Sequence, residues 1–203
     1  VSVSEILSYE HKNDVNVFFK KPNFLNEDNK KIYTSIDIGN LYHLFMQNME
    51  LKSKIDIDYI NSEINRMINT QILENEDLNY LNPHKILKFF NTNLGIRLIK
   101  CLNDNKNKIY REFEFLMKHK VDKICKNESI RIQGIIDLFF FEDDKLILVD
   151  YKTDKMIFKN NKQIPLKYKE QLKYYKLALE KIFKKEVKEK YIYSFEISEE
   201  IRI

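Results

Sequence analysis

The sequence is poor in the residues on which several classes of protein depend. Its 203 residues include two cysteines, three glycines, three prolines and no tryptophan. Cys101 and Cys125 cannot supply the four thiolates of an iron–sulfur cluster or a zinc ribbon, and their isolation argues against a disulfide framework. We therefore expect no iron–sulfur cluster and two free, buried thiols in a reducing cytoplasm.

Two longer patterns are also missing. No Gly-x-x-x-x-Gly-Lys-Ser/Thr motif occurs, so this chain cannot bind and hydrolyse ATP through a P-loop. No apolar run approaches the roughly 18–20 residues of a membrane span, and the start does not resemble a secretion signal. The chain begins at Val1 without Met, and we expect it to be a piece of a longer protein.

The charge of the chain is uneven. Overall the net charge is +4 with a pI near 8.8, which by itself proves nothing about nucleic acid. Residues 151–190 hold thirteen lysines and five acids, a net +8, and the rest of the chain therefore carries −4. We expect this basic stretch to attract a phosphate backbone without regard to its sequence.

The first half of the chain reads as helical. After an expected short helix at 4–7 and a polar loop to about residue 33, apolar residues recur every three or four positions from Ser35 to Met49. The same rhythm follows Asp56 as far as Ile68. Pro83 opens a third helix, and Thr92 caps a fourth that reaches Ile99.

The second half changes to the alternation that is typical of strands. We expect strands over 109–117, 129–141, 146–152 and 190–195, and a helix over 166–183 between the last two strands. The fold class is therefore α/β, a mixed β-sheet flanked by helices. We expect residues 1–203 to form one domain, mainly helical over 1–108 and with an α/β core over 109–203.

Two aspartates and a lysine carry the chemistry. Asp137 and Asp150 are each embedded in apolar strand sequence, where a carboxylate is costly unless it is paired or bound to a metal. Lys152 shares a strand face with Asp150, and a hairpin through Asp143-Asp144 brings Asp137 across from Asp150. Carboxylate oxygens bind Mg²⁺ or Mn²⁺, and an ammonium stabilises a phosphate or a nucleophile, so the set suits phosphodiester hydrolysis.

Four motifs follow one another along the chain: Ile38-Gly39-Asn40-Leu41-Tyr42-His43, Gly134-Ile135-Ile136-Asp137-Leu138, Asp150-Tyr151-Lys152-Thr153 and Gln171-Leu172-Lys173-Tyr174-Tyr175. In this order they resemble the motifs of the RecB-type nucleases of the PD-(D/E)XK superfamily, above all the AddA (RexA) type nuclease domains of bacterial helicase–nucleases. The resemblance covers nearly all 203 residues and implies a restriction-endonuclease-like core.

The resemblance implies a function as well as a fold. It implies His43, Asp137 and Asp150 as ligands of Mg²⁺ or Mn²⁺, with Lys152 as the catalytic lysine. The activity would be that of a deoxyribonuclease, an exonuclease on a single DNA strand that a helicase delivers, in double-strand break repair and recombination. The setting would be the bacterial cytoplasm, with a second nuclease subunit of the AddB (RexB) type as partner and no membrane.

Three further residues are implied to lie at the site. Gln171 and Tyr175 lie one helical turn apart and can both face the scissile phosphate, although such residues on a lysine-rich helix usually only pack. Glu112 resembles the upstream glutamate of the family, but it could equally pair with Arg111, and Glu114 shares its strand face. His43 taken alone would usually be an ordinary core or surface histidine.

Two other interpretations remain open. The chain could be a nuclease fold retained for binding DNA or docking a partner, without turnover. It could also be a restriction-type endonuclease built on the same core. Binding of Mn²⁺ separates the first interpretation from an enzyme, and a helicase upstream in the same reading frame would dismiss the second.

Overall fold

A computed structural model of the chain describes residue 3 and residues 33–104, 108–120, 129–154 and 164–203. The expected helix at 4–7 and Cys125 lie outside these residues. The elements, in chain order, are α2 (Ser35–Asn48), α3 (Ile57–Asn69), the 3₁₀ helix η2 (Asn75–Asn79), α4 (Pro83–Phe90), α5 (Asn93–Leu102), β1 (Ile109–Lys120), β2 (Ser129–Glu142), β3 (Lys145–Lys152), α6 (Leu166–Phe183), β4 (Val187–Ser194) and β5 (Glu199–Arg202).

The helices begin where the sequence predicts. The side chains of Asp56 and Thr92 accept backbone N–H groups at the starts of α3 and α5, and Pro83 is the first residue of α4. Thr34 and Asp37 form a capping box at the start of α2. Because these caps satisfy N–H groups that have no partner within a helix, local sequence fixes the four starts.

The strands form one five-stranded sheet in the order β1-β2-β3-β4-β5. All neighbours are antiparallel except β3 and β4, which are parallel and are joined through α6. The mixed α/β architecture is therefore confirmed. Two details differ: β4 begins at Val187, earlier than the expected Lys190, and β5 is not among the expected strands, because three of its four residues are charged and its one apolar residue, Ile201, gives no alternation.

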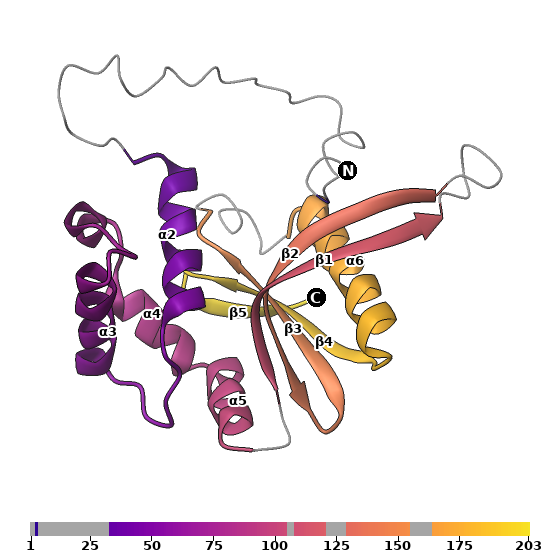
Figure 1. The fold of residues 1–203 in the computed structure, drawn as a ribbon. Helices are drawn as coiled ribbons and strands as arrows, with labels where there is room; N and C mark the ends of the chain where they lie inside the picture. The colour runs from indigo at the N-terminus through magenta and orange to yellow at the C-terminus, as the bar shows by residue number, and fades with distance from the viewer. Residues whose placement is uncertain (1–2, 4–32, 105–107, 121–128, 155–163) are drawn as a thin grey trace, which may run out of the picture.

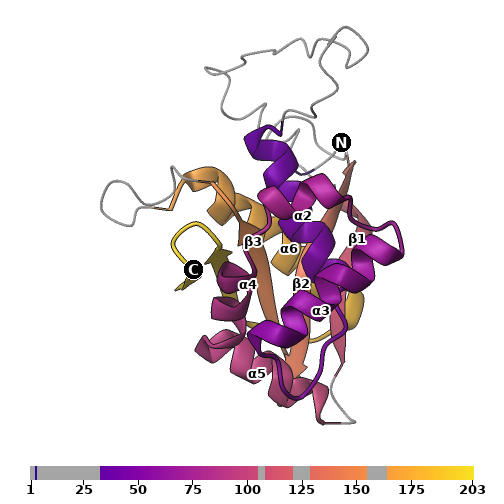
Figure 2. The same ribbon diagram turned by 90° about the vertical axis from the view of Figure 1, so that its left-hand side faces the viewer.

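The sheet lies between two helical layers. Helices α2 to α5 cover one face and α6 covers the other, as Figures 1 and 2 show from two sides. Each face has its own apolar core. The helical-side core includes Phe45, Ile60, Phe89, Leu138, Phe140 and Val149. The α6-side core includes Phe115, Ile136, Phe139, Leu148, Leu172 and Leu179.

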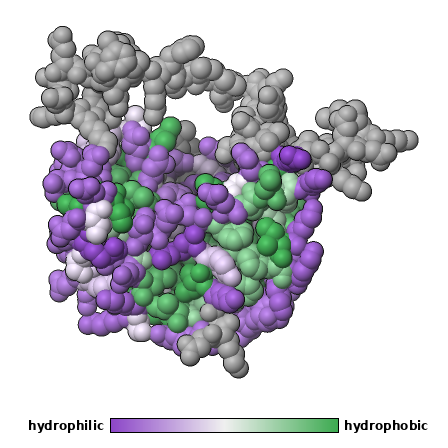
Figure 3. Space-filling model, viewed as in Figure 1, coloured by the Kyte–Doolittle hydropathy of each residue, from purple (hydrophilic) through white to green (hydrophobic). Residues whose placement is uncertain are grey.

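The surface is mostly polar on the side drawn in Figure 3. Hydrophilic residues cover much of the helical layer there, and apolar colour gathers where β1 crosses α6. Cys101 is buried as a free thiol, as expected. None of the helices in the described ranges is long and apolar enough to cross a bilayer.

Candidate active site

The site forms where β2 and β3 separate. The two strands are joined by a turn in which Asp143 and Asp144 have φ values of 50° and 62°, a conformation that these residues tolerate in two-residue hairpins. Backbone pairing then runs as far as Leu138 opposite Val149. One step further, the N–H of Tyr151 donates to Asp137 Oδ2 at 2.6 Å. The buried carboxylate of Asp137 thus replaces a missing backbone partner, and the predicted meeting of Asp137 with the end of β3 is confirmed.

Strand β1 brings Glu112 to the same place through an unusual backbone. Glu112 has a φ of 47°, a left-handed conformation that is uncommon for residues other than glycine. Arg111 and Phe113 pair regularly with β2 on either side of it. Tyr110 and Phe113 both pack in the α6-side core although they are three residues apart, so the alternation of β1 breaks once at this point. Arg111 and Glu112 therefore both face α2.

Strand β2 loses its alternation at the same level. Ile136 and Phe139 both lie in the α6-side core, whereas Leu138 lies in the helical-side core. Asp137, opposite Glu112, consequently turns toward α2 as well. The left-handed backbone of Glu112 is costly, and strain of this kind concentrates at functional sites.

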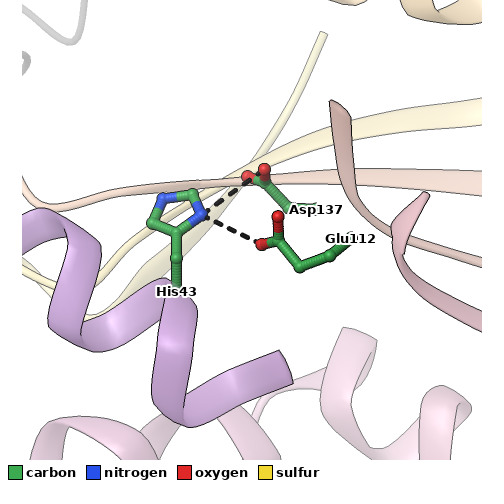
Figure 4. Close-up of side chains that lie close together, drawn as sticks. All are labelled: His43, Glu112 and Asp137. Carbon is green, nitrogen blue, oxygen red and sulfur yellow. Dashed lines mark ion pairs between the residues drawn. The ribbon is translucent and has the colours of Figure 1, made fainter. Parts of the chain in front are cut away.

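Helix α2 supplies His43 from above the sheet. A Cβ at Gly39, one turn earlier, would lie 3.0 Å from Thr153 Oγ1, so the glycine lets the helix approach the chain that follows β3. His43 Nδ1 lies 3.4 Å from Asp137 Oδ1 and 3.5 Å from Glu112 Oε1 (Figure 4). Ligand atoms of these three residues all lie within 4.8 Å of one another. His43 and Glu112 also line a groove of about 470 Å³, which gives the cluster access to solvent.

The charges of the cluster alter its titration. Burial by itself lowers the pKa of His43, but hydrogen bonds to Asp137 and Glu112 outweigh it and raise the pKa to about 10. Burial raises the pKa of Asp137, but the opposite effects of His43 and Lys152 are larger together, and the net shift is downward. An imidazolium thus holds the two carboxylates together when no metal is bound.

Asp150 and Lys152 lie next to this cluster on β3. Lys152 Nζ is 2.6 Å from Asp150 Oδ2, so the predicted common face is confirmed. Oδ2 is thus engaged by Lys152, whereas Oδ1 has no hydrogen-bond partner among the described residues, although the residue is fully buried. Burial raises the pKa of Asp150 to about 6, against the lowering effect of Lys152. A buried carboxylate with one unpartnered oxygen suits a cation.

Lys152 remains a cation in this setting. Burial lowers its pKa, but the charges of Asp150 and Asp137 outweigh burial, and the net shift is upward. Its Nζ also lies 5.1 Å from the ring centroid of Tyr168 on α6. The lysine is therefore held between the sheet and α6.

The two residues predicted on α6 lie together. Gln171 Nε2 donates to the hydroxyl of Tyr175 at 2.8 Å, as their spacing of four predicts. The Tyr175 ring contacts Phe115 edge to face, and a Cβ at Gly134 would lie 2.9 Å from Phe115 and 3.3 Å from Tyr175. The glycine of the second motif thus makes room for the aromatic pair beside the site.

The basic stretch is less concentrated at the site than expected. Lys185 pairs with Asp144, and Lys188 with Glu142, at the opposite end of β3 from Lys152. Residues 155–163 of the stretch lie outside the described residues. Lys167 lies nearer the site. Its Nζ is 4.7 Å from the centroid of the Tyr168 ring, which also lies beside Lys152.

The donor set fits a divalent cation. One imidazole nitrogen and two carboxylates converge, and a third carboxylate, Asp150, lies beside them, paired with Lys152 through Oδ2 and with no hydrogen-bond partner on Oδ1 among the described residues. Oxygen-rich sets of this kind suit Mg²⁺ and Mn²⁺. Of the ligands that the resemblance implies, the converging group contains His43 and Asp137 together with Glu112, whereas Asp150 faces Lys152.

The sequence left Glu112 open between the site and a pairing with Arg111, and it indicated no contact of Arg111 with the helical layer. The break in alternation that turns both side chains toward α2 depends on one backbone angle, and no sequence signal marks it. Glu114, the competing acid, lies opposite Ile135 and is exposed. Of the two acids, Glu112 is the one that meets His43.

Comparisons with known proteins agree with this geometry. The family model of the PD-(D/E)XK nuclease superfamily matches residues 9–200. The A subunit of the ATP-dependent helicase/nuclease of Clostridium botulinum (strain Loch Maree) is 40% identical over 195 residues, and that of Clostridium perfringens (strain 13) is 36% identical over 192 residues. The alignments cover 92% and 91% of this chain and 14% and 15% of those proteins, so the chain spans about one seventh of the relatives it matches.

Among solved structures, the crystal structure of SSO0001 aligns over 85% of this chain and 76% of its own, with a TM-score of 0.36 and 14% identity, too low a likeness to bear on the fold. The family model and the topology decide the assignment. Nucleases of the matched superfamily use divalent metals, in agreement with the donors found at the β2–β3 fork. The chain belongs to the PD-(D/E)XK nuclease superfamily, and its homologous region in the clostridial relatives lies within the A subunit of their helicase/nuclease.

Proposed function

We propose that the chain is a metal-dependent deoxyribonuclease domain that hydrolyses phosphodiester bonds in a single DNA strand. The observation that carries the proposal is the convergence of His43, Glu112 and Asp137 beside the buried pair of Asp150 and Lys152. Three carboxylates gather at this point of the sheet, and one oxygen of the buried Asp150 has no hydrogen-bond partner among the described residues, an arrangement that suits a bound cation. Membership of a nuclease superfamily supports the same function.

The proposed metal ligands are His43, Asp137 and Asp150, with Glu112 close enough to join them. The ion would be Mg²⁺ or Mn²⁺, which when bound acidifies a water molecule and offsets the charge of the phosphate. His43 must give up the proton that it shares with the two carboxylates before its Nδ1 can coordinate. Asp137 keeps its orientation through the N–H of Tyr151.

The proposed role of Lys152 is electrostatic. Its pKa is raised, so at neutral pH the side chain is an ammonium and cannot serve as a general base. A buried cation next to the metal ligands instead stabilises negative charge that develops on the phosphate. Asp150 holds the ammonium in place at 2.6 Å.

Gln171 and Tyr175 are proposed to contact the phosphate or its neighbours. Their side chains are already joined by a hydrogen bond on one face of α6, so they act as one polar unit. The Tyr175 ring is fixed by Phe115 and by the space above Gly134. A prearranged donor loses little freedom when the strand binds.

The wider setting is also a proposal. The clostridial relatives are subunits of a helicase/nuclease. By that analogy we propose that residues 1–203 form a single exonuclease domain, which acts in DNA repair and recombination on a strand delivered by a helicase. By the same analogy we propose that it acts in the bacterial cytoplasm, with a second nuclease subunit of the AddB type as partner. The shared core of helices and sheet supports the single domain.

The test uses a labelled single-stranded oligonucleotide with Mg²⁺ or Mn²⁺, and with EDTA as the metal-free reference. We expect Asp137→Asn and Lys152→Met to lower the cleavage rate at least about 100-fold. Asp58→Asn, an exposed acid on α3, serves as the matched control and leaves the rate unchanged. Cleavage at the wild-type rate by Asp137→Asn in a pure preparation would remove the assigned site.

A second function, DNA binding or docking without turnover, makes a different prediction. A retired site has no reason to retain a buried, unsatisfied carboxylate such as that of Asp150. Titration with Mn²⁺ separates the two, because an enzyme of the proposed kind binds the ion near neutral pH. Absence of binding would favour the docking function.

A further inference from the structure

The C-terminal end of α2 is held by arginines from outside the helix. Its own last turn contains no basic residue. Arg111 Nη1 donates to the carbonyls of Met46 at 3.0 Å and Met49 at 2.5 Å, and Arg66 Nη2 donates to the carbonyl of Asn48 at 2.8 Å. Because the last carbonyls of a helix lack partners and carry the negative end of its dipole, both contacts stabilise the helix end.

The two arginines connect α2 to different parts of the molecule. Arg66 belongs to α3 and also pairs with Glu63 of its own helix at 2.7 Å, so its contact lies within the helical layer. Arg111 belongs to β1, directly before Glu112, and joins α2 to the sheet. Its polar contacts among the described residues are the two α2 carbonyls alone.

The same interface contains the proposed metal site. His43 lies three residues before Met46, one turn of helix away from the carbonyls that Arg111 binds. Across the interface, His43 meets Glu112, the neighbour of Arg111, at 3.5 Å. The left-handed backbone of Glu112 makes this possible, since it turns two consecutive residues of one strand toward α2.

We propose that Arg111 is a positioning residue of the metal site: it fixes α2 on the sheet so that His43 faces Glu112 and Asp137. Burying a guanidinium without a carboxylate partner costs free energy. The contacts that Arg111 gains by this burial are the ones that join α2 to β1. The inference rests on the proposed function, because it assigns Arg111 a role toward the metal. Arg111 affects the binding of the ion indirectly, because it determines the position of the His43 imidazole.

The test compares three variants of the 203-residue chain. Arg111→Met removes the link between α2 and the sheet, and Arg66→Met removes a contact at the same helix end without touching the sheet. Arg111→Lys is the conservative variant, because a single nitrogen makes both contacts and an ammonium can donate to two carbonyls. Circular dichroism and urea unfolding establish the temperature at which all four proteins are folded.

Two readouts are taken at that temperature. Calorimetric titration with Mn²⁺ gives the dissociation constant, and NMR gives the imidazole resonances of His43 in the metal-free protein, assigned with His43→Asn. We expect Arg111→Met to weaken Mn²⁺ binding about 10- to 100-fold, as residues that orient a ligand do. It should also shift the His43 resonances. We expect Arg66→Met to change binding less than about threefold and Arg111→Lys to recover most of the affinity.

Two results would overturn the inference. One is unchanged Mn²⁺ affinity and unchanged His43 resonances in folded Arg111→Met. The other is equal weakening by Arg66→Met, which would trace the effect to the stability of the helix end. If the wild-type protein binds no Mn²⁺, the proposed function fails, whereas the His43 resonances still decide whether Arg111 positions the imidazole.

Discussion

Two clusters of charge lie at opposite ends of the segment over which β2 and β3 are paired, and they are built differently. At one end, Arg97 of α5 pairs with Glu142 through two nitrogens at 2.7 and 2.9 Å, and with Glu189 at 2.7 Å, while Tyr191 donates to Glu189. At the other end, the buried Asp150 keeps one oxygen without a hydrogen-bond partner among the described residues, and His43 is shared between two acids. The first cluster is satisfied by the protein alone and the second is not.

The difference separates structural charge from functional charge. The carboxylates around Arg97 have lowered pKa values, because each is stabilised in its charged form. Asp150 has a raised pKa, because burial outweighs its pairing with Lys152. Polar groups that a fold leaves unsatisfied are candidates for binding a ligand, whereas a satisfied network holds elements together. Variants at the two ends of the strands should therefore affect different quantities.

The largest effect is expected for Asp150→Asn. We predict that the cleavage rate falls about 1,000-fold, because a ligand carboxylate and the partner of Lys152 are lost together. Stability should change little, because the gain from removing a buried carboxylate with a raised pKa offsets the loss of the partner of Lys152. Rates on the labelled strand and urea unfolding measure the two quantities. If the free energy of unfolding falls by as much as the activation free energy rises, Asp150 is a structural residue, and the proposed difference between the two clusters is wrong.

Arg97→Met should do the reverse. Removing Arg97 leaves Glu142 with the longer contact to Lys188 and Glu189 with Tyr191 and the longer contact to Arg202, and we predict a loss of about 3 kcal/mol in the free energy of unfolding. The cleavage rate of the folded protein should not change, because the network lies at the far end of the strands. A fall in rate under conditions where the variant is fully folded would contradict this division.

The pH dependence of stability should expose the Arg97 network. Arg97 lowers the folded-state pKa of Glu142 through its hydrogen bonds, and it outweighs burial to lower that of Glu189. Carboxylates with lowered pKa values contribute stability above their unfolded pKa, near ~4.3, and lose it as the pH falls through the folded values. The stability difference between wild type and Arg97→Met should be full at pH 7 and shrink below about pH 4, as urea unfolding at several pH values can check. A difference independent of pH would show that the carboxylates are not its source.

The smallest effect is expected for Tyr175→Phe. The variant removes the hydroxyl that accepts from Gln171, and the loss of one hydrogen bond of ~1 kcal/mol corresponds to about fivefold in rate. Tyr59→Phe on α3, which also loses one hydrogen bond, is the matched control and should leave the rate unchanged. Equal rates for Tyr175→Phe and wild type would restrict Tyr175 to packing against Phe115.

Much of the fold could be predicted from local signals. The caps at Asp56 and Thr92 and the proline at residue 83 fix helix starts, because they act on neighbouring backbone groups. Alternation predicted β1, β2 and β3, and the turn at Asp143-Asp144 predicted the hairpin of β2 and β3. The strand β5 could not be predicted, because its pairing with β4, and not its own composition, makes it a strand.

The site could be predicted in part for the same reason. Asp150 and Lys152 are two residues apart on one strand, and Gln171 and Tyr175 are four apart on one helix, so spacing alone brings each pair together. The distribution of lysines could not be predicted, because Lys185 and Lys188 lie at the end of the sheet far from Lys152. Their partners are distant in sequence.

The sequence by itself determined the elements, the ordered motifs and the residues that could bind a metal, because these depend on spacing within one helix or strand. Only the tertiary structure decided which of those residues meet. The left-handed backbone of Glu112 turns it and Arg111 toward α2, and the fork between β2 and β3 gives Asp137 the N–H of Tyr151. The physical reason is that a site made by several elements depends on how they pack. Packing joins residues from 14 positions apart (Asp137 and Tyr151) to 94 positions apart (His43 and Asp137) through contacts that no local pattern records.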